Sequence, residues 1–195
     1  EARRLVEDFQ NKAEVAGRRA VQLDPRNATG YGALAAIAND RGKWAEAEDF
    51  FRQALAFDAN DPEVLFGYVN MLTAAGRLKA AASVSEKLRN LESLVPAYVM
   101  RYAIGMIHTG QNAAAIALLE ALPTDSGISI SYGRNTALAA AYADAGRYAE
   151  AANTLLAIKG NLVSRQSIEE AARLLRQAPM KTNEPEKLPV LEGAL

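Results

Sequence analysis

The sequence predicts an all-α fold in which pairs of helices repeat along the chain and stack on one another. Gly42, Gly76 and Gly110 are each 34 residues apart, and Gly146 follows 36 residues later. A period of this length is typical of one helix–turn–helix unit. Apolar residues recur at helical spacing on both sides of each glycine. Hydrophobic residues make up 50% of the 195-residue chain, which is enough to bury a core.

Each unit is expected to hold a first helix that ends at its glycine and a second helix that follows. Glycine readily adopts the left-handed conformation of a C-terminal cap. Pro62 and Pro96 are expected at the starts of first helices, with Asp61 as an N-terminal cap. Small residues would let the paired helices approach closely at Ala35, Ala47, Ala54, Ala81, Ala103, Ala115, Ala139 and Ala151.

The segments around the glycines share one pattern, in which a mostly bulky residue follows two positions after Gly and Ala follows five positions after it. The segments run from Asn39 to Ala47, Thr73 to Ala81, Ile107 to Ala115 and Ala143 to Ala151. With this pattern the chain resembles a tetratricopeptide repeat protein over roughly residues 13–160. The third unit departs from it, because Asn112 stands where a bulky residue is usual. The resemblance implies a right-handed superhelical solenoid.

Aligning the units predicts the division of the chain. Residues 1–27 are expected to form a partial N-terminal repeat, followed by repeats at 28–61, 62–95, 96–131 and 132–163. Residues 123–131 would form a longer connection before the fourth repeat. A capping helix is expected at 164–178, since a solenoid needs to cover its last apolar face. A flexible tail is expected at 179–195, where the chain is polar and rich in proline before it ends in apolar residues.

Composition argues against catalysis and against several classes of ligand. The chain has no cysteine and one histidine, His108, so the usual zinc clusters are excluded, and we predict no cofactor and no enzyme activity. Basic and acidic residues are interspersed at a net charge of −1, which argues against nucleic acid as a partner. No apolar run approaches the roughly 20 residues of a membrane span, so we predict no membrane insertion. The compartment is left open between cytoplasm and periplasm.

The resemblance also implies where a partner binds, because in this family the first helix of each pair lines a concave groove. The implied contact residues are Asn39, Phe66, Asn70, Thr73, Met100, Arg101, Ile104, Ile107, His108 and Asp144. In the fourth repeat the same face carries Gly133, Thr136, Ala140, Ala143 and Asp144. A clamp for a terminal carboxylate is not expected, because Arg101 is the only matching cation. The apolar middle of the groove predicts an apolar or amphipathic partner segment.

The function predicted is therefore a scaffold for protein–protein interaction. Two alternatives are open: a regulatory or docking arm of a larger multidomain protein, and a self-assembling scaffold that forms homo-oligomers. Charged residues are scarce between Arg101 and Arg134, where Ile116 is expected to face outward. Such apolar side chains would form a contact patch, or would pack against the 123–131 connection or the tail.

Overall fold

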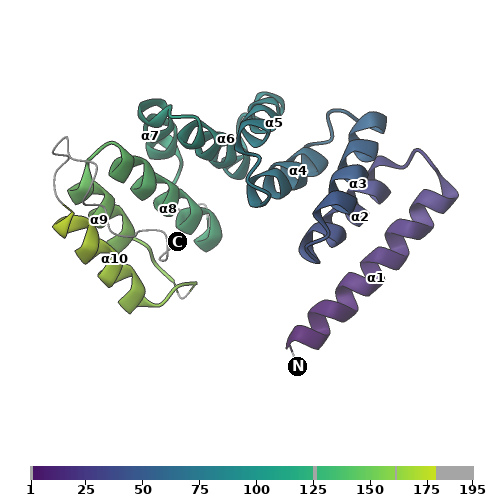
Figure 1. The fold of residues 1–195 in the computed structure, drawn as a ribbon, viewed down its shortest axis with the longest axis horizontal. Helices are drawn as coiled ribbons and strands as arrows, with labels where there is room; N and C mark the ends of the chain where they lie inside the picture. The colour runs from purple at the N-terminus through teal and green to yellow at the C-terminus, as the bar shows by residue number, and fades with distance from the viewer. Residues whose placement is uncertain (1, 125–126, 161, 179–195) are drawn as a thin grey trace. The chain divides into compact units, whose positions relative to one another are not determined.

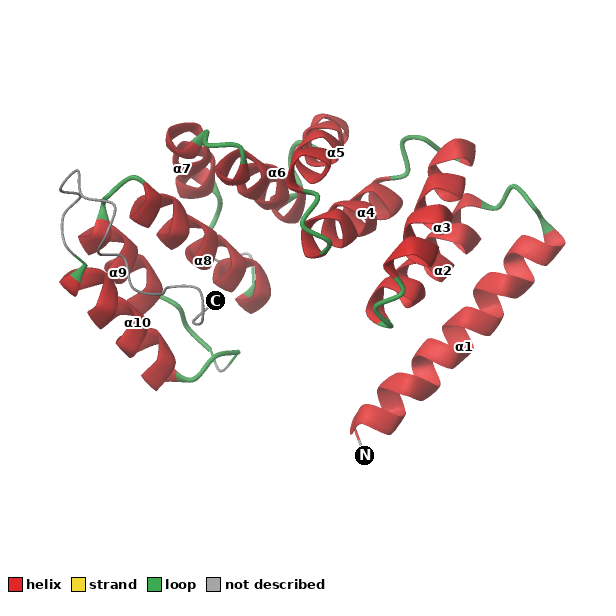
Figure 2. Cartoon of the chain, in the orientation of Figure 1, coloured by secondary structure: helices red, strands yellow, loops and turns green. Residues whose placement is uncertain are grey.

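The computed structural model describes residues 2–124, 127–160 and 162–178, and every regular element within them is a helix (Figure 2). The predicted all-α class is confirmed. The helices, labelled in Figure 1, are α1 (Ala2–Leu23), α2 (Ala28–Asp40), α3 (Trp44–Phe57), α4 (Pro62–Ala74), α5 (Leu78–Leu91), α6 (Pro96–His108), α7 (Asn112–Ala121), α8 (Ile128–Asp144), α9 (Tyr148–Leu156) and α10 (Arg165–Gln177). The tail predicted at 179–195 lies outside the described residues.

The four glycines of the repeat end the first helices as predicted. Gly42, Gly76, Gly110 and Gly146 have φ angles of 71°, 71°, 81° and 75°. After α2, the Gly42 amide donates to the carbonyl of residue 39, and the amide of residue 43 donates to that of residue 38, each at 2.9 Å. The same pair of backbone bonds closes α4, α6 and α8. This is the Schellman motif, which satisfies the last carbonyl groups of a helix.

The helix starts are fixed by equally local contacts. Asn27 Oδ1 accepts a hydrogen bond from the amide of Gly30 at 2.7 Å and so caps α2. The predicted cap at Asp61 is confirmed, and Pro62 is the first residue of α4. Ser164 caps α10. Each cap satisfies a backbone N–H group that has no partner within its own helix.

The chain divides into two compact units, and unit 1 ends at Tyr98 in the first turn of α6. Within unit 1, α2 packs with α3, and α4 packs with α5. One core cluster comprises Ala35, Ala38, Ala47, Phe51, Ala54, Val64, Met71, Leu72 and Ala81, and a second comprises Leu65, Leu88 and Tyr98. The small residues predicted at helix–helix contacts are thus buried in this unit.

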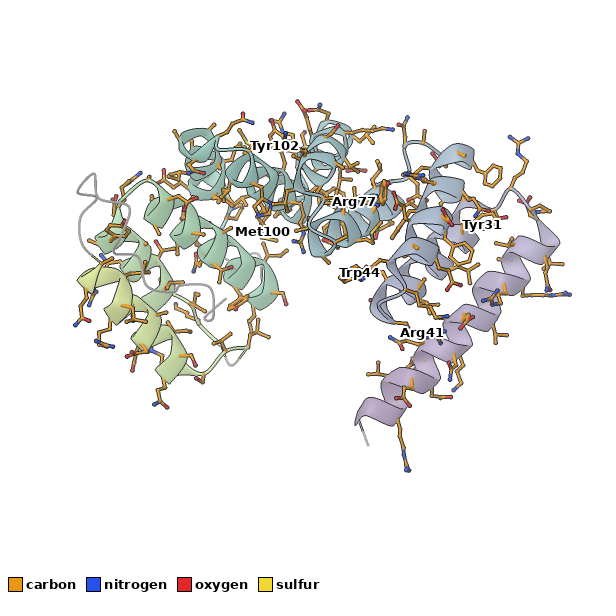
Figure 3. The ribbon with its side chains drawn as sticks, viewed as in Figure 1. Tyr31, Arg41, Trp44, Arg77, Met100 and Tyr102 are labelled. Atoms are coloured by element: carbon orange, nitrogen blue, oxygen red, sulfur yellow. The ribbon has the colours of Figure 1, made fainter. Side chains whose placement is uncertain are left out.

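Helix α1 packs on α2 through a close approach and through charged groups. A Cβ atom on Gly17 would lie 3.2 Å from the Leu34 side chain, so the two helices meet where residue 17 has no side chain. Figure 3 shows Arg41 beside α1, where its guanidinium pairs with Glu14 and donates to Asn11 Oδ1 at 2.8 Å. These contacts fix α1 to the end of α2.

Unit 2 begins at Val99 and holds the rest of α6 with α7 to α10. Helix α8 packs against α7 and α9, and α9 packs against α10. The core cluster comprises Met100, Ala103, Met106, Ala115, Ile116, Leu119, Leu122, Leu138, Ala139, Ala141, Tyr142, Ala151, Ala152, Ala172 and Leu175. The predicted small residues of these repeats are buried as well.

Two expectations for this unit are wrong. Ile116 is only 6% exposed, because α7 packs against α8 and Ile116 belongs to the core that these helices share, so it does not contribute to an exposed contact patch. Helix α8 begins at Ile128 rather than at residue 132, which shortens the connection predicted at 123–131. Gly127, with a φ angle of 90°, precedes the helix, and Ile130 packs on the core, which accounts for the extra turn. The other segment boundaries stay predictions.

Candidate functional site

In unit 1 the first helices of neighbouring pairs, α2 and α4, lie in direct contact. A Cβ atom on Gly32 would lie 2.9 Å from Val64 Cγ2, so the missing side chain allows this close approach. The two helices run in the same direction, because α3 turns the chain back between them. Asn39 lies about two turns beyond Gly32, and Asn70 lies nearly two turns beyond Val64. The two asparagines are therefore at a similar height along adjacent helices. We call the surface of α2 and α4 that carries Asn39 and Asn70 the α2–α4 face.

Both asparagines of the α2–α4 face carry an unsatisfied acceptor. Asn39 and Asn70 are half-buried residues. The side-chain Oδ1 atom of each is itself buried and accepts no hydrogen bond from any residue that the structure describes. Leaving a buried acceptor unpaired costs about 1–3 kcal/mol, and such atoms are few in folded proteins.

Two other predicted contact residues lie on α4 in the same unit. The Phe66 ring is half-buried, and its centroid lies 5.4 Å from that of Tyr98. Thr73 Oγ1 donates to the carbonyl of Val69 at 2.8 Å, so its proton is used within the helix. Burial, together with a 3.1 Å hydrogen bond to Glu63, raises the pKa of the Tyr98 phenol. Phe66 thus exposes part of its ring to solvent while the rest of the side chain packs near the Tyr98 ring.

The remaining predicted contact residues belong to unit 2, and three apolar ones on α6 pack inward. Met100 is only 7% exposed, and a Cβ atom on Gly133 would lie 2.8 Å from its sulfur. Ile104 and Ile107 are half-buried against the core. His108 is exposed at the last residue of α6. Met100 therefore supports α8 more than it presents surface to a ligand.

The two charged residues of the predicted set differ in their surroundings. Arg101 is half-buried, and this burial lowers the pKa of its guanidinium. Arginine nonetheless remains a cation in proteins, because its usual pKa is far above neutrality. Asp144 is exposed at the end of α8, with its Oδ2 atom 3.5 Å from Asn112 Nδ2. The ten predicted residues therefore form two sets, with Asn39, Phe66, Asn70 and Thr73 on unit 1 and the others on unit 2.

Unit 2 also contains a cavity of about 530 Å³ between α8 and α10. Its walls are Tyr132, Thr136, Ala139, Ala140, Ala143, Asp144, Leu155, Ile158, Val163, Ser167, Ile168, Ala171 and Leu175. The α8 wall includes four of the five residues that the family resemblance implied for the fourth repeat, with Gly133 outside the lining. The α10 wall was not predicted as part of a site. The sequence feature that could have revealed this wall is the helical spacing of the apolar residues Ile168, Ala171 and Leu175. In the sequence analysis this spacing indicates only the inner side of a capping helix.

Two further features concern the described residues alone. Within them, no group of three or more His, Asp and Glu side chains is placed to hold a metal ion. Among the described helices, none combines the length and the apolar character that a membrane crossing needs.

Comparison with known proteins relates this arrangement to one family. The family model for the tetratricopeptide repeat matches residues 38–99. A search of curated proteins found no match. Among solved structures, YrrB, described as a TPR protein with an unusual peptide-binding site, superposes with a TM-score of 0.63 at 15% identity, covering 90% of this chain and 82% of YrrB.

Two further solved structures show the same likeness. TTC0263, a thermophilic TPR protein of Thermus thermophilus, gives a TM-score of 0.64 at 16% identity and covers 90% of this chain and 95% of its own. PilF of Pseudomonas aeruginosa gives 0.63 at 19% identity, with 91% of this chain and 88% of its own covered. At such identities the likeness shows the fold. Residues 38–99 carry the sequence pattern of the tetratricopeptide repeat, and the chain has the fold of tetratricopeptide repeat proteins.

Proposed function

We propose that the protein is a scaffold for protein–protein interaction, and that its α2–α4 face binds an apolar or amphipathic segment of a partner. The observation that carries this proposal is the pair of unsatisfied side-chain oxygens on Asn39 and Asn70. Natural proteins accept a local cost of this kind mainly at functional sites. The fold itself does not supply the function, which has to come from the site.

The chemistry of an asparagine pair suits the backbone of a bound segment. Each amide offers one acceptor oxygen and two donor hydrogens, and a peptide backbone offers the complementary N–H and C=O groups. Because both oxygens are buried, each amide has to rotate to bring its oxygen to a backbone N–H of the partner. The exposed part of the Phe66 ring then supplies apolar contact beside these bonds. In such a surface the asparagines bind the main chain of the partner, and Phe66 selects an apolar side chain next to these hydrogen bonds.

The other predicted contacts lie on unit 2, and we propose them as partner contacts of that unit by itself. Arg101 is a partly desolvated cation, and hydrogen bonds from such a group to a carboxylate or carbonyl are stronger than neutral ones. His108 and Asp144 are exposed at helix ends, where polar groups at the rim of an interface favour correct pairing. Binding is stoichiometric, and no covalent step takes place.

The test compares the full chain with a double variant, Asn39→Leu with Asn70→Leu. Leucine is close to asparagine in size and removes both acceptors. Immobilised protein captures partners from a lysate, mass spectrometry identifies them, and calorimetry then measures peptides that tile the captured protein. We expect the double variant to bind the best peptide at least tenfold more weakly, because a net hydrogen bond is worth about 1 kcal/mol and two are lost.

The matched control is Asn90→Leu, which places the same substitution on an exposed position of α5. It should bind like the wild type. If the double variant also binds normally, the partner lies elsewhere and the α2–α4 face is not the site. Light scattering over a range of concentrations separates the self-assembly alternative, which predicts a mass that grows with concentration. The docking-arm alternative would be favoured if the captured segment belonged to another domain of a larger protein that also contains this chain.

A further inference from the structure

The cavity between α8 and α10 presents a largely apolar lining. Ala140 and Ala143 of α8 face a wall formed by Ile168, Ala171 and Leu175 of α10. Among the described residues of the lining, Asp144 alone carries a charge. An apolar recess with few polar groups suits an apolar segment rather than a charged or nucleotide ligand.

The chain carries a segment of matching chemistry just beyond α10. Residues 179–187 are mostly polar and include two prolines, and residues 188–195 read Leu-Pro-Val-Leu-Glu-Gly-Ala-Leu. Within these last eight residues Glu192 is the single charged side chain. Apolar side chains in such a run gain from leaving water, and the apolar cavity provides a place to do so.

We propose that residues 188–195 bind in cis in the α8–α10 cavity. The tether is long enough for this contact. Nine residues, 179–187, span up to about 30 Å when extended. The lining residues of α10 from Ile168 to Leu175 cover only about 10 Å of helix, and Leu175 is itself close to the point where α10 ends at Gln177. Every part of the cavity is therefore within reach of the segment.

The tether also favours the attached segment 188–195 over a free peptide as the occupant of the cavity. A short linker of suitable length holds its attached segment at an effective concentration in the millimolar range. A free peptide of the same sequence has to compete with that concentration, so it binds well only when the attached segment is removed or weakened. The segment thus acts as a built-in competitor for any partner of unit 2. This contact involves neither Asn39 nor Asn70, so it stands or falls separately from the α2–α4 face.

The experiment keeps the full chain and changes the segment. One variant carries Leu188→Asp with Leu191→Asp, and a matched control carries Thr182→Asp with Asn183→Asp in the polar tether. A synthetic peptide with the sequence of residues 186–195 is titrated into each chain by calorimetry. We expect the first variant to bind the peptide at least tenfold more tightly than the wild type and the tether control do. In the same variant, methyl NMR signals of Ile158 and Ile168 should shift from their wild-type positions.

Further variants fill the cavity. Ala140→Glu and Ala171→Met, each combined with the weakened segment, should abolish peptide binding while circular dichroism reports intact helicity; the second substitution is mild enough to guard against misfolding. Equal binding to all chains would overturn the proposal, because the attached segment would then not compete. Absence of binding to every chain would overturn it as well. A wild-type mass that rises with concentration, and falls in the Leu188→Asp, Leu191→Asp variant, would place the segment in a second copy and so reject the contact in cis.

Discussion

At the scale of single residues, the glycines of the turns have a left-handed backbone conformation and open space at the position of a Cβ atom. Gly76 has a φ angle of 71°, yet apart from the glycine and its two chain neighbours no atom lies within 4 Å of the place where a Cβ would stand. A substitution at this position is therefore strained by its backbone conformation alone. The left-handed conformation costs other L-residues roughly 1–2 kcal/mol, and less for asparagine.

We predict that Gly76→Ala lowers the free energy of unfolding by about 1–2 kcal/mol. Gly76→Val should cost more, because β-branched side chains resist this region most, and Gly76→Asn should cost least. Urea unfolding followed by circular dichroism measures the order. If valine proved as stable as glycine, the turn would not require the left-handed conformation in solution.

At the scale of helices, one of the contacts that hold α1 on α2 responds to pH. Hydrogen bonds from Arg18 and from Arg41 hold the pKa of Glu14 below its ordinary value of 4.5. Because the pKa is lower in the folded chain, the contact stabilises the fold at pH values above the unfolded pKa and is lost as the pH falls through the folded one. Glu150 and Glu170 have lowered pKa values too, but their arginine partners lie within or next to their own helices. Glu14 differs because its pair with Arg41 joins α1 to the end of α2.

We therefore predict that acid loosens α1 before the other helices of unit 1. Hydrogen exchange measured at pH 7 and at pH 3, corrected for the intrinsic rates, should show the loss of protection in α1 first. The Glu14→Gln variant should show faster exchange in α1 already at pH 7 and little further change on acidification. Identical protection of α1 at both pH values in the wild type would contradict the role of this carboxylate.

At the scale of the whole molecule, the two units have separate cores. Leu88 in unit 1 and Leu119 in unit 2 are both 0% exposed. Truncating a buried leucine to alanine usually costs about 2–5 kcal/mol. In repeat proteins each unit contacts mainly its neighbours, so the damage stays near the site of the change.

We predict that Leu88→Ala speeds hydrogen exchange mainly in α4 and α5, and that Leu119→Ala does so mainly in α7 and α8. Leu94→Ala is the control, because Leu94 is 92% exposed and its loss should change the stability by less than about 0.5 kcal/mol. Uniform acceleration along the chain in either core variant would show that the units unfold as one.

The parts of this molecule that depend on neighbours in sequence could be predicted, and the parts that depend on distant packing could not. The caps at Asp61 and the four glycines follow from short-range rules, and both were predicted correctly. The burial of Ile116 depends on α8, which starts earlier than the repeat alignment indicates. The cavity walls come from helices whose pairing no single helical pattern reveals. The unsatisfied oxygens of Asn39 and Asn70 likewise require knowledge of what surrounds each atom.

The Schellman turns have a consequence for how such a chain can grow. Each turn is closed by backbone hydrogen bonds within its own hairpin, and its glycine has open space around the Cβ position. The turn therefore requires no contact with residues of other hairpins. A tandem duplication of residues 62–95 would thus bring its own terminator and its own initiating proline at Pro62. Lengthening by one whole period preserves the register of every downstream element, whereas an insertion of any other length has to be absorbed in a loop.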